Sequence, residues 1–234
     1  GAVAAALADL NGDGYDDLVL GRVYDGIRHD LNAIIFYGSA DGLSEARQQR
    51  LPVARATSIT ASDFNGDGRV DLAFAHAGGL RVFYQTELGF EPKRYEDVDI
   101  AASQICATDM DREGHADLFV LGNDGEATIF WGSDDGLTAE RTSEVPTEIG
   151  IGGVEDDVKV SEMEAQSTVA TGAQANVVEL ARVPHLSLPL DDRLMLLPVR
   201  EDRSFGEALL LAVPTALGVA TGDINGDGYL DLAI

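Results

Sequence analysis

One loop pattern occurs four times in this chain of 234 residues. Each copy reads D-x-[ND]-x-[DE]-G-x-x-D followed by leucine, and the copies align without a gap. Successive copies begin 54, 46 and 114 residues apart, and because the last interval is about twice the others, it indicates a hidden repeat. The four segments are DLNGDGYDDL (Asp9–Leu18), DFNGDGRVDL (Asp63–Leu72), DMDREGHADL (Asp109–Leu118) and DINGDGYLDL (Asp223–Leu232).

The segments around the loops also repeat. Small residues precede each loop, as expected for an innermost strand, and a strand that begins with leucine follows it. A third strand with an aromatic pair recurs at 34–43, 81–90 and 128–137, and the similar segment 194–205 locates the hidden repeat. With a fourth strand such as 49–54, repeats of this length predict an all-β fold, a β-propeller of four-stranded antiparallel blades.

The repeats divide the chain into about four and a half blades of an incomplete ring. The fourth blade is expected to be degenerate, because Glu155–Lys159, where its loop should begin, lacks the asparagine and the glycine. The fifth stops inside its second strand, so we expect the natural polypeptide to continue beyond residue 234. The approximate blades are 1–52, 53–98, 99–147, 148–212 (with an insertion) and 213–234.

The loop pattern predicts a calcium site. Side chains at positions 1, 3, 5 and 9 can converge on one point, position 7 offers its carbonyl, and the glycine at position 6 permits the sharp turn. Five or six hard oxygen ligands suit Ca²⁺ better than Mg²⁺, which keeps more of its water. The predicted ligands are Asp9, Asn11, Asp13, Tyr15 and Asp17; Asp63, Asn65, Asp67, Arg69 and Asp71; Asp109, Asp111, Glu113, His115 and Asp117; and Asp223, Asn225, Asp227, Tyr229 and Asp231.

Other interpretations of the loops fit less well. Asn-Gly and Asp-Gly also form plain hairpin turns, but four copies that each end in an aspartate at position 9 disfavour that interpretation. An EF-hand needs a glutamate at position 12 and flanking helices, and neither is present. No histidine or cysteine side chain is placed to bind zinc or copper. The loop led by Asp109 is expected to bind more weakly, because the longer side chain of Glu113 must fold back to reach the ion.

The formal net charge of −25 restricts the partners. Nucleic acids and anionic membrane surfaces both require a basic footprint, so neither is expected to bind. Fourteen of the 41 acidic residues lie in the four loops, where their repulsion would be severe without cations. A salt-adapted surface would account for the others. One cysteine, Cys106, gives no disulfide framework.

The loops, the segment Tyr15–Gly21 and the turn Phe36–Ser44 resemble the FG-GAP repeats of integrin α-subunit propellers and their bacterial relatives. The resemblance implies a propeller, seven-bladed in its full form, with calcium loops between the first two strands of a blade, on the face opposite the usual ligand surface. It also implies an extracellular, cell-surface or periplasmic location. Any membrane contact is then expected only through regions outside this sequence.

Two function classes follow. The first is a non-catalytic recognition or adhesion module for a protein or glycan ligand, and no catalytic residue or organic cofactor is predicted. The second is the propeller scaffold of a secreted enzyme, such as a polysaccharide lyase, with its chemistry elsewhere in the polypeptide or in the segment 148–192. In both, Ca²⁺ is the expected cofactor and serves the stability of the fold.

Overall fold

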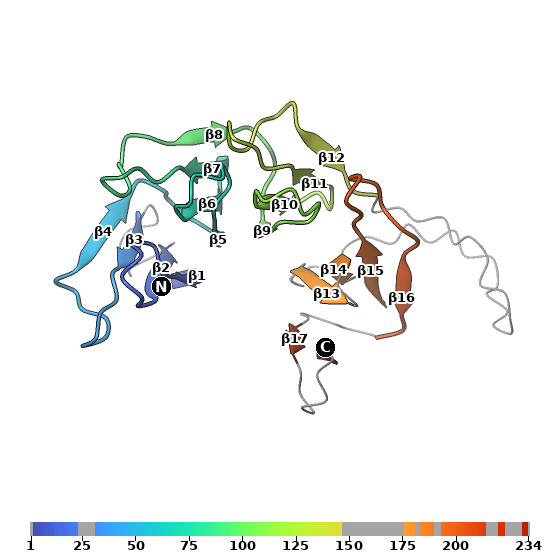
Figure 1. Ribbon diagram of the computed structural model, residues 1–234, viewed down its shortest axis with the longest axis horizontal. Coiled ribbons are helices and arrows are strands. Elements are labelled where there is room, and N and C mark those ends of the chain that lie inside the picture. The colour runs from blue at the N-terminus through green and yellow to red at the C-terminus, as the bar shows by residue number, and fades with distance from the viewer. Residues whose placement is uncertain are drawn as a thin grey trace, which may run out of the picture. The chain divides into compact units, whose positions relative to one another are not determined.

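The computed structural model describes residues 2–22, 31–146, 176–180, 183–189, 193–213, 220–222 and 231–233 (Figure 1). Every element of regular secondary structure in these ranges is a β-strand. Among the described residues, no helix has the length and apolar character needed to cross a membrane. The chain forms two compact units, one of Gly1–Glu144 with Glu201–Arg203 and one of Val145–Arg200 with Ser204–Ile234.

The first unit contains three sheets, each of four antiparallel strands in chain order. Each sheet therefore contains only hairpin connections, and the loop pattern lies between its first two strands. The strands are β1 (Ala2–Ala8), β2 (Asp17–Arg22), β3 (Ala33–Phe36) and β4 (Gln48–Leu51); β5 (Ser58–Ser62), β6 (Asp71–His76), β7 (Gly79–Phe83) and β8 (Glu96–Val98); and β9 (Gln104–Thr108), β10 (Asp117–Leu121), β11 (Ala127–Phe130) and β12 (Thr142–Glu144).

The second unit contains a fourth sheet of the same topology and a strand pair. The sheet consists of β13 (Asn176–Leu180), β14 (Val183–Pro189), β15 (Leu194–Pro198) and β16 (Leu209–Leu211), and β17 (Ala220–Gly222) pairs with β18 (Asp231–Ala233). Since β15 is the third strand, the hidden repeat lies where its hydrophobic segment predicted. These antiparallel four-stranded sheets confirm the predicted all-β propeller fold.

One expectation about the hidden repeat is wrong. In the fourth sheet Leu180 of β13 pairs with Val183 of β14, so residues 181–182 connect the first two strands. In the first three sheets the acidic loop occupies this connection. This connection is too short to contain the nine-residue loop, as expected for a degenerate repeat, but it lies at residues 181–182 and not at Glu155–Lys159, where the loop was expected to begin. The residues 155–159 themselves lie outside the described part of the chain.

The middle strands of the first unit are covered on both faces. Five successive residues of β10 are buried, as are the first five of β6. In β6, Ala73 and Ala75 pack in a cluster with the third sheet. Phe74 and Phe83 meet edge to face, with ring centroids 5.9 Å apart. Leu72, Phe74 and Phe83 share one hydrophobic cluster with Val19 and Ile35 of the first sheet. The repeats thus bury a continuous core that none could form alone.

The first strands of the three sheets lie next to one another, β1 beside β5 and β5 beside β9 (Figure 1). Their small side chains permit this approach, and polar contacts join them. The Ser58 hydroxyl accepts a hydrogen bond from the Ile105 amide at 3.1 Å and lies 3.3 Å from the Ile105 carbonyl. Because each loop follows its first strand, this packing also brings neighbouring loops together.

Candidate metal centres

The loops led by Asp9 and Asp63 have the same internal geometry. The carboxylate at position 1 accepts two backbone hydrogen bonds, which for Asp9 come from the amides of Asp13 at 3.1 Å and Gly14 at 2.8 Å. The corresponding bonds to Asp63 are 3.2 and 2.8 Å long. The amide oxygen at position 3 accepts from position 5 in both loops. These bonds hold the side chains at positions 1 and 3 against the backbone amides of their own loop.

The aspartate at position 9 is fully buried in all three described loops, at Asp17, Asp71 and Asp117. One oxygen accepts the backbone amide of position 2, at 2.7 to 3.0 Å. The other accepts an amide from just beyond the third strand, at 2.7 to 2.9 Å, from Gly38, Gln85 or Gly132. Each carboxylate therefore ties its loop to the third strand of the same sheet.

Burial is unfavourable for these negative charges. Burial raises the pKa of Asp71 and of Asp117 to about 7, against the backbone hydrogen bonds that lower it, and the other loop carboxylates raise it further. The pKa of Asp17 is also raised, with burial as the largest cause. A bound cation would remove this penalty, because it favours the ionised form.

The third loop brings carboxylate oxygens of Asp109, Asp111 and Asp117 within 4.8 Å of one another. Asp109 Oδ1 is buried and has no hydrogen-bond partner. An unpartnered buried carboxylate oxygen among other carboxylates fits a hard cation such as Ca²⁺. The residues at positions 1, 3 and 9 of this loop are thus compatible with a metal ion.

Arginine and histidine side chains contact the same third loop. Arg203 Nε donates to Asp111 Oδ2 at 2.7 Å, and its Nη2 lies 3.3 Å from Glu113 Oε2. Arg141 Nη2 and His115 Nδ1 lie 3.6 and 3.3 Å from Glu113 Oε1. Glu113 was expected to fold back toward an ion. Instead, nitrogen atoms of arginine or histidine lie beside both of its carboxylate oxygens. The positions of the carboxylates would permit a metal ion here, but the arginine side chains compete with such an ion for Asp111 and Glu113.

Neighbouring loops of the first unit are in direct contact. The Ala116 amide donates to the Asp63 carbonyl at 3.0 Å, and the Ser133 amide donates to the Phe64 carbonyl at 3.3 Å. The ring of His115 packs against Gly66, where an added Cβ would lie 2.7 Å from the ring. His115 was expected to act only through its carbonyl, so this packing of its side chain is an addition from the structure.

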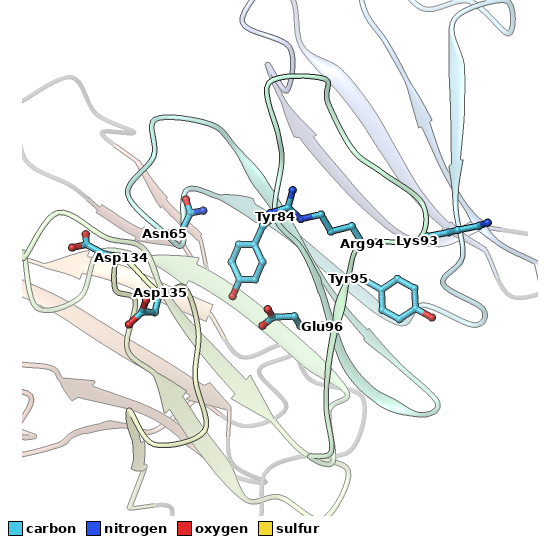
Figure 2. Close-up of a pocket in the computed structure, with 8 residues that line it drawn as sticks. All are labelled: Asn65, Tyr84, Lys93, Arg94, Tyr95, Glu96, Asp134 and Asp135. Atoms are coloured by element: carbon cyan, nitrogen blue, oxygen red, sulfur yellow. The ribbon is translucent and has the colours of Figure 1, made fainter.

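A polar groove of about 450 Å³ lies beside the second and third loops. Figure 2 shows Asn65, Asp134 and Asp135 on one side of Tyr84, and Lys93, Arg94 and Tyr95 on the other. The Tyr84 hydroxyl accepts the Leu137 amide at 2.8 Å, which joins the second sheet to the turn of the third. Hydrogen-bond donors, acceptors and aromatic rings thus line one concavity, as in many ligand sites.

Among the described residues, three acidic side chains come within 4.8 Å of one another only in the Asp109 loop, at Asp109, Asp111 and Asp117. In the Asp9 and Asp63 loops the predicted side chains at positions 1 and 3 are hydrogen-bonded to the backbone of their own loop. The loop at 223–231 lies outside the described residues, apart from the backbone of β18. Sequence reasoning missed the amides of Gly38, Gln85 and Gly132 and the guanidinium of Arg203. The glycine after the aromatic pair was an available signal, because an added Cβ at Gly38 or Gly132 would lie 2.3 or 2.5 Å from a carbonyl oxygen.

Comparison with known families agrees with the repeat. The FG-GAP-like repeat matches residues 9–74 and 63–120, and the FG-GAP repeat matches residues 216–234. Integrin alpha pat-2 of Caenorhabditis briggsae is 35% identical to this chain over 78 residues. That match spans 33% of this chain but only 6% of the integrin.

Solved structures share the fold at low sequence identity. A lectin structure from Agrocybe aegerita, described as recognising non-reducing terminal N-acetylglucosamine, matches with a TM-score of 0.59 and 17% identity, over 89% of this chain and 51% of the lectin. BBS1N in complex with ARL6DN matches with a TM-score of 0.50 and 13% identity, over all of this chain and 75% of that one. Both similarities concern the fold alone.

Proposed function

This chain belongs to the FG-GAP repeat family, and on that premise we propose that it is a calcium-stabilised part of a recognition or adhesion propeller. Calcium in the loops led by Asp9, Asp63 and Asp223 fixes the connection between the first two strands of each blade and neutralises the carboxylates there. Weak sites, with Kd on the order of 10⁻⁴–10⁻³ M, would tie folding to calcium-rich surroundings. Such surroundings are extracellular, at the cell surface or periplasmic.

One observation carries the calcium proposal. In the Asp9 and Asp63 loops the fully buried aspartate at position 9 is repelled by the carboxylates at positions 1 and 5. Among the ion pairs of the described residues, none joins that buried carboxylate to an arginine. Arg69 does pair with Asp67, but on the more exposed side of its loop. A divalent cation within the loop offsets the repulsion, and the oxygen-only ligand set favours calcium.

Chelation is expected to lower the melting temperature strongly. At free calcium about 10 to 100 times Kd, each filled site adds roughly 1.4–2.7 kcal/mol to the free energy of unfolding, and EDTA removes it. The measurement is thermal unfolding with calcium, with magnesium and with EDTA, together with elemental analysis of the dialysed protein. An equal melting temperature in all three, with no calcium found, would contradict the proposal.

Recognition is the second part of the proposed function. Similarity to FG-GAP repeats and to an integrin favours a non-catalytic module with a protein or glycan ligand over an enzyme scaffold. Within the described residues, the groove around Tyr84 is a suitable ligand site, because it offers donors, acceptors and two aromatic rings together. The strongly negative net charge disfavours nucleic acid as its ligand.

A groove variant tests this location. Asp135→Ala should weaken binding to any glycan or protein identified on a glycan array or in a cell-adhesion assay, by about tenfold for one lost charged contact. Asp41→Ala is the matched control, since Asp41 is exposed and has the corresponding place in the turn of the first repeat. If both variants bind like the parent chain, the ligand site lies elsewhere.

A further inference from the structure

In the third loop an arginine side chain, Arg203, contacts two of the predicted metal ligands, Asp111 and Glu113. We propose that the guanidinium of Arg203 is the resident cation of the Asp109 loop, which therefore keeps its form without calcium, whereas the Asp9 and Asp63 loops require calcium. The inference rests on the proposed calcium binding of those two loops and deepens it. It also makes Arg203 a position that decides which repeats of this chain respond to calcium.

The contacts of Arg203 are those of a bound cation. Its Nε donates to Asp111 Oδ2 at 2.7 Å and its Nη2 lies 3.3 Å from Glu113 Oε2. The guanidinium carbon lies 5.1 Å from the ring centroid of Trp131, which is itself buried. The Asp111 side chain is only 3% exposed, so Arg203 takes the place that water has beside an exposed carboxylate. Carboxylate pairing and an aromatic face together are a strong guanidinium site.

The third loop differs from the other two at the positions that Arg203 contacts. Position 3 is a neutral amide in Asn11 and Asn65, but a carboxylate in Asp111. Position 5 is aspartate in the first two loops and Glu113 in the third, and the carboxylate of Glu113 lies near Arg203, Arg141 and His115. The loop therefore has an additional acid that a guanidinium compensates, and its position 5 ligand is engaged by cations.

The turn that contributes to each site changes in parallel. Aligned on the hydrophobic residue that closes each turn, Asp41, Leu88, Asp135 and Arg203 take the same place in their repeats. Leu88 shares a groove with Asn11, Asp135 shares one with Asn65, and Arg203 contacts Asp111. The loop with an acid at position 3 is thus the loop that meets an arginine from a turn. Arg203 belongs to the same compact unit as this loop.

The backbone of the third loop also departs from the calcium pattern. Position 4 is glycine in the first two loops, with φ of 72° and 69°, but Arg112 in the third, with φ of 61°. A side chain at positive φ is strained and persists only when the surrounding contacts hold it. Arg203, at φ 66°, is strained in the same way. The ion pairs between the loop and the turn are suitable contacts to hold both conformations.

Calcium stoichiometry of loop variants tests the inference. Bound calcium is measured by equilibrium dialysis with elemental analysis, at 1 mM free calcium, for the parent chain, Asp63→Asn and Asp109→Asn. We expect Asp63→Asn to lose one ion and Asp109→Asn to lose none. Loss of one ion in Asp109→Asn would overturn the inference, because the third loop would then hold calcium beside Arg203.

Removal of the guanidinium gives the second test. Arg203→Gln should gain one calcium ion, or at least a tenfold higher affinity at one site, and Arg203→Gln with Asp109→Asn should lose that gain. No gain in the folded single variant would count against the inference. If Arg203→Gln unfolds without calcium, recovery of its folded circular dichroism by calcium supports the inference, and failure to recover contradicts it.

The two proposals fail in different ways. If the parent chain binds no calcium and Asp63→Asn changes nothing, calcium binding by the first two loops is wrong. If Asp63→Asn and Asp109→Asn each lose one ion, calcium binding stands and only the role of Arg203 is wrong. Arg203→Lys is the matched charge control, since it keeps the cation but loses the forked hydrogen bonding of the guanidinium.

Discussion

Replacement of Asp71 by alanine is expected to lower the free energy of unfolding by roughly 2–6 kcal/mol, even in EDTA. Asp71 is fully buried and accepts the amides of Phe64 at 3.0 Å and Gln85 at 2.8 Å. Alanine leaves both donors without an acceptor, and each buried unsatisfied donor costs about 1–3 kcal/mol. Urea denaturation of the chelated protein measures the change directly.

Asp63→Ala is the matched control for Asp71→Ala. Asp63 accepts the amides of Asp67 and Gly68, but in an exposed part of the same loop, where water can replace the carboxylate. With calcium present, both variants should lose the stabilisation that the ion gives to this loop. In EDTA, only Asp71→Ala should remain strongly destabilised. Equal losses for the two variants in EDTA would show that Asp71 does not tie the loop to the third strand.

The spacing of acids, asparagine and glycine predicted where the loops and their flanking strands lie, because a repeat of this kind fixes local geometry. β2, β6 and β10 begin at Asp17, Asp71 and Asp117, the last acid of each loop. The same spacing failed in the fourth repeat, whose first two strands are joined at residues 181–182. With no acidic loop there, the sequence contained no marker for that connection.

The role of Arg203 could not be read from the repeat. It lies 92 positions from Asp111, and the repeat pattern gives no residue type for the turn position that it occupies. From the sequence alone, this turn position is a variable surface position, because the four repeats have Asp41, Leu88, Asp135 and Arg203 there. Only the fold brings this turn against the third loop. A contact within one repeat recurs in every copy and is therefore visible in the repeat pattern. A contact between two repeats involves residues that differ from copy to copy, so the pattern does not reveal it.

The double role of the last loop aspartate was missed for a related reason. The calcium pattern assigns Asp17, Asp71 and Asp117 to the ion, and the partner amides of Gly38, Gln85 and Gly132 lie 14 to 21 residues farther along the chain. Two of these three partners are glycines that a side chain would force away from a carbonyl. The third is glutamine, so no single residue type marks the contact.

The stability of the calcium-free protein is expected to rise as the pH falls from 8 to 5. Burial raises the pKa of Asp71 and Asp117 from 3.8 to about 7. Between about pH 4 and 7 the folded state therefore binds more protons than the unfolded state, and stability falls as the pH rises through this window, by a few kcal/mol per group. Lower repulsion in a chain of net charge −25 acts in the same direction.

Calcium should reverse this dependence on pH, because the ion favours the ionised carboxylates and protons compete with it. Melting temperatures at pH 5, 6, 7 and 8, with saturating calcium and with EDTA, measure both curves. The gain from calcium should be largest at pH 8 and small at pH 5. Asp71→Asn, which cannot titrate, should make the EDTA curve less steep, while the contribution of Asp117 remains. Asp97→Asn, at an exposed ion pair with Arg81, should leave the slope unchanged. An EDTA curve that falls from pH 8 to pH 5 in the parent chain would mean that these buried aspartates are ionised without a cation.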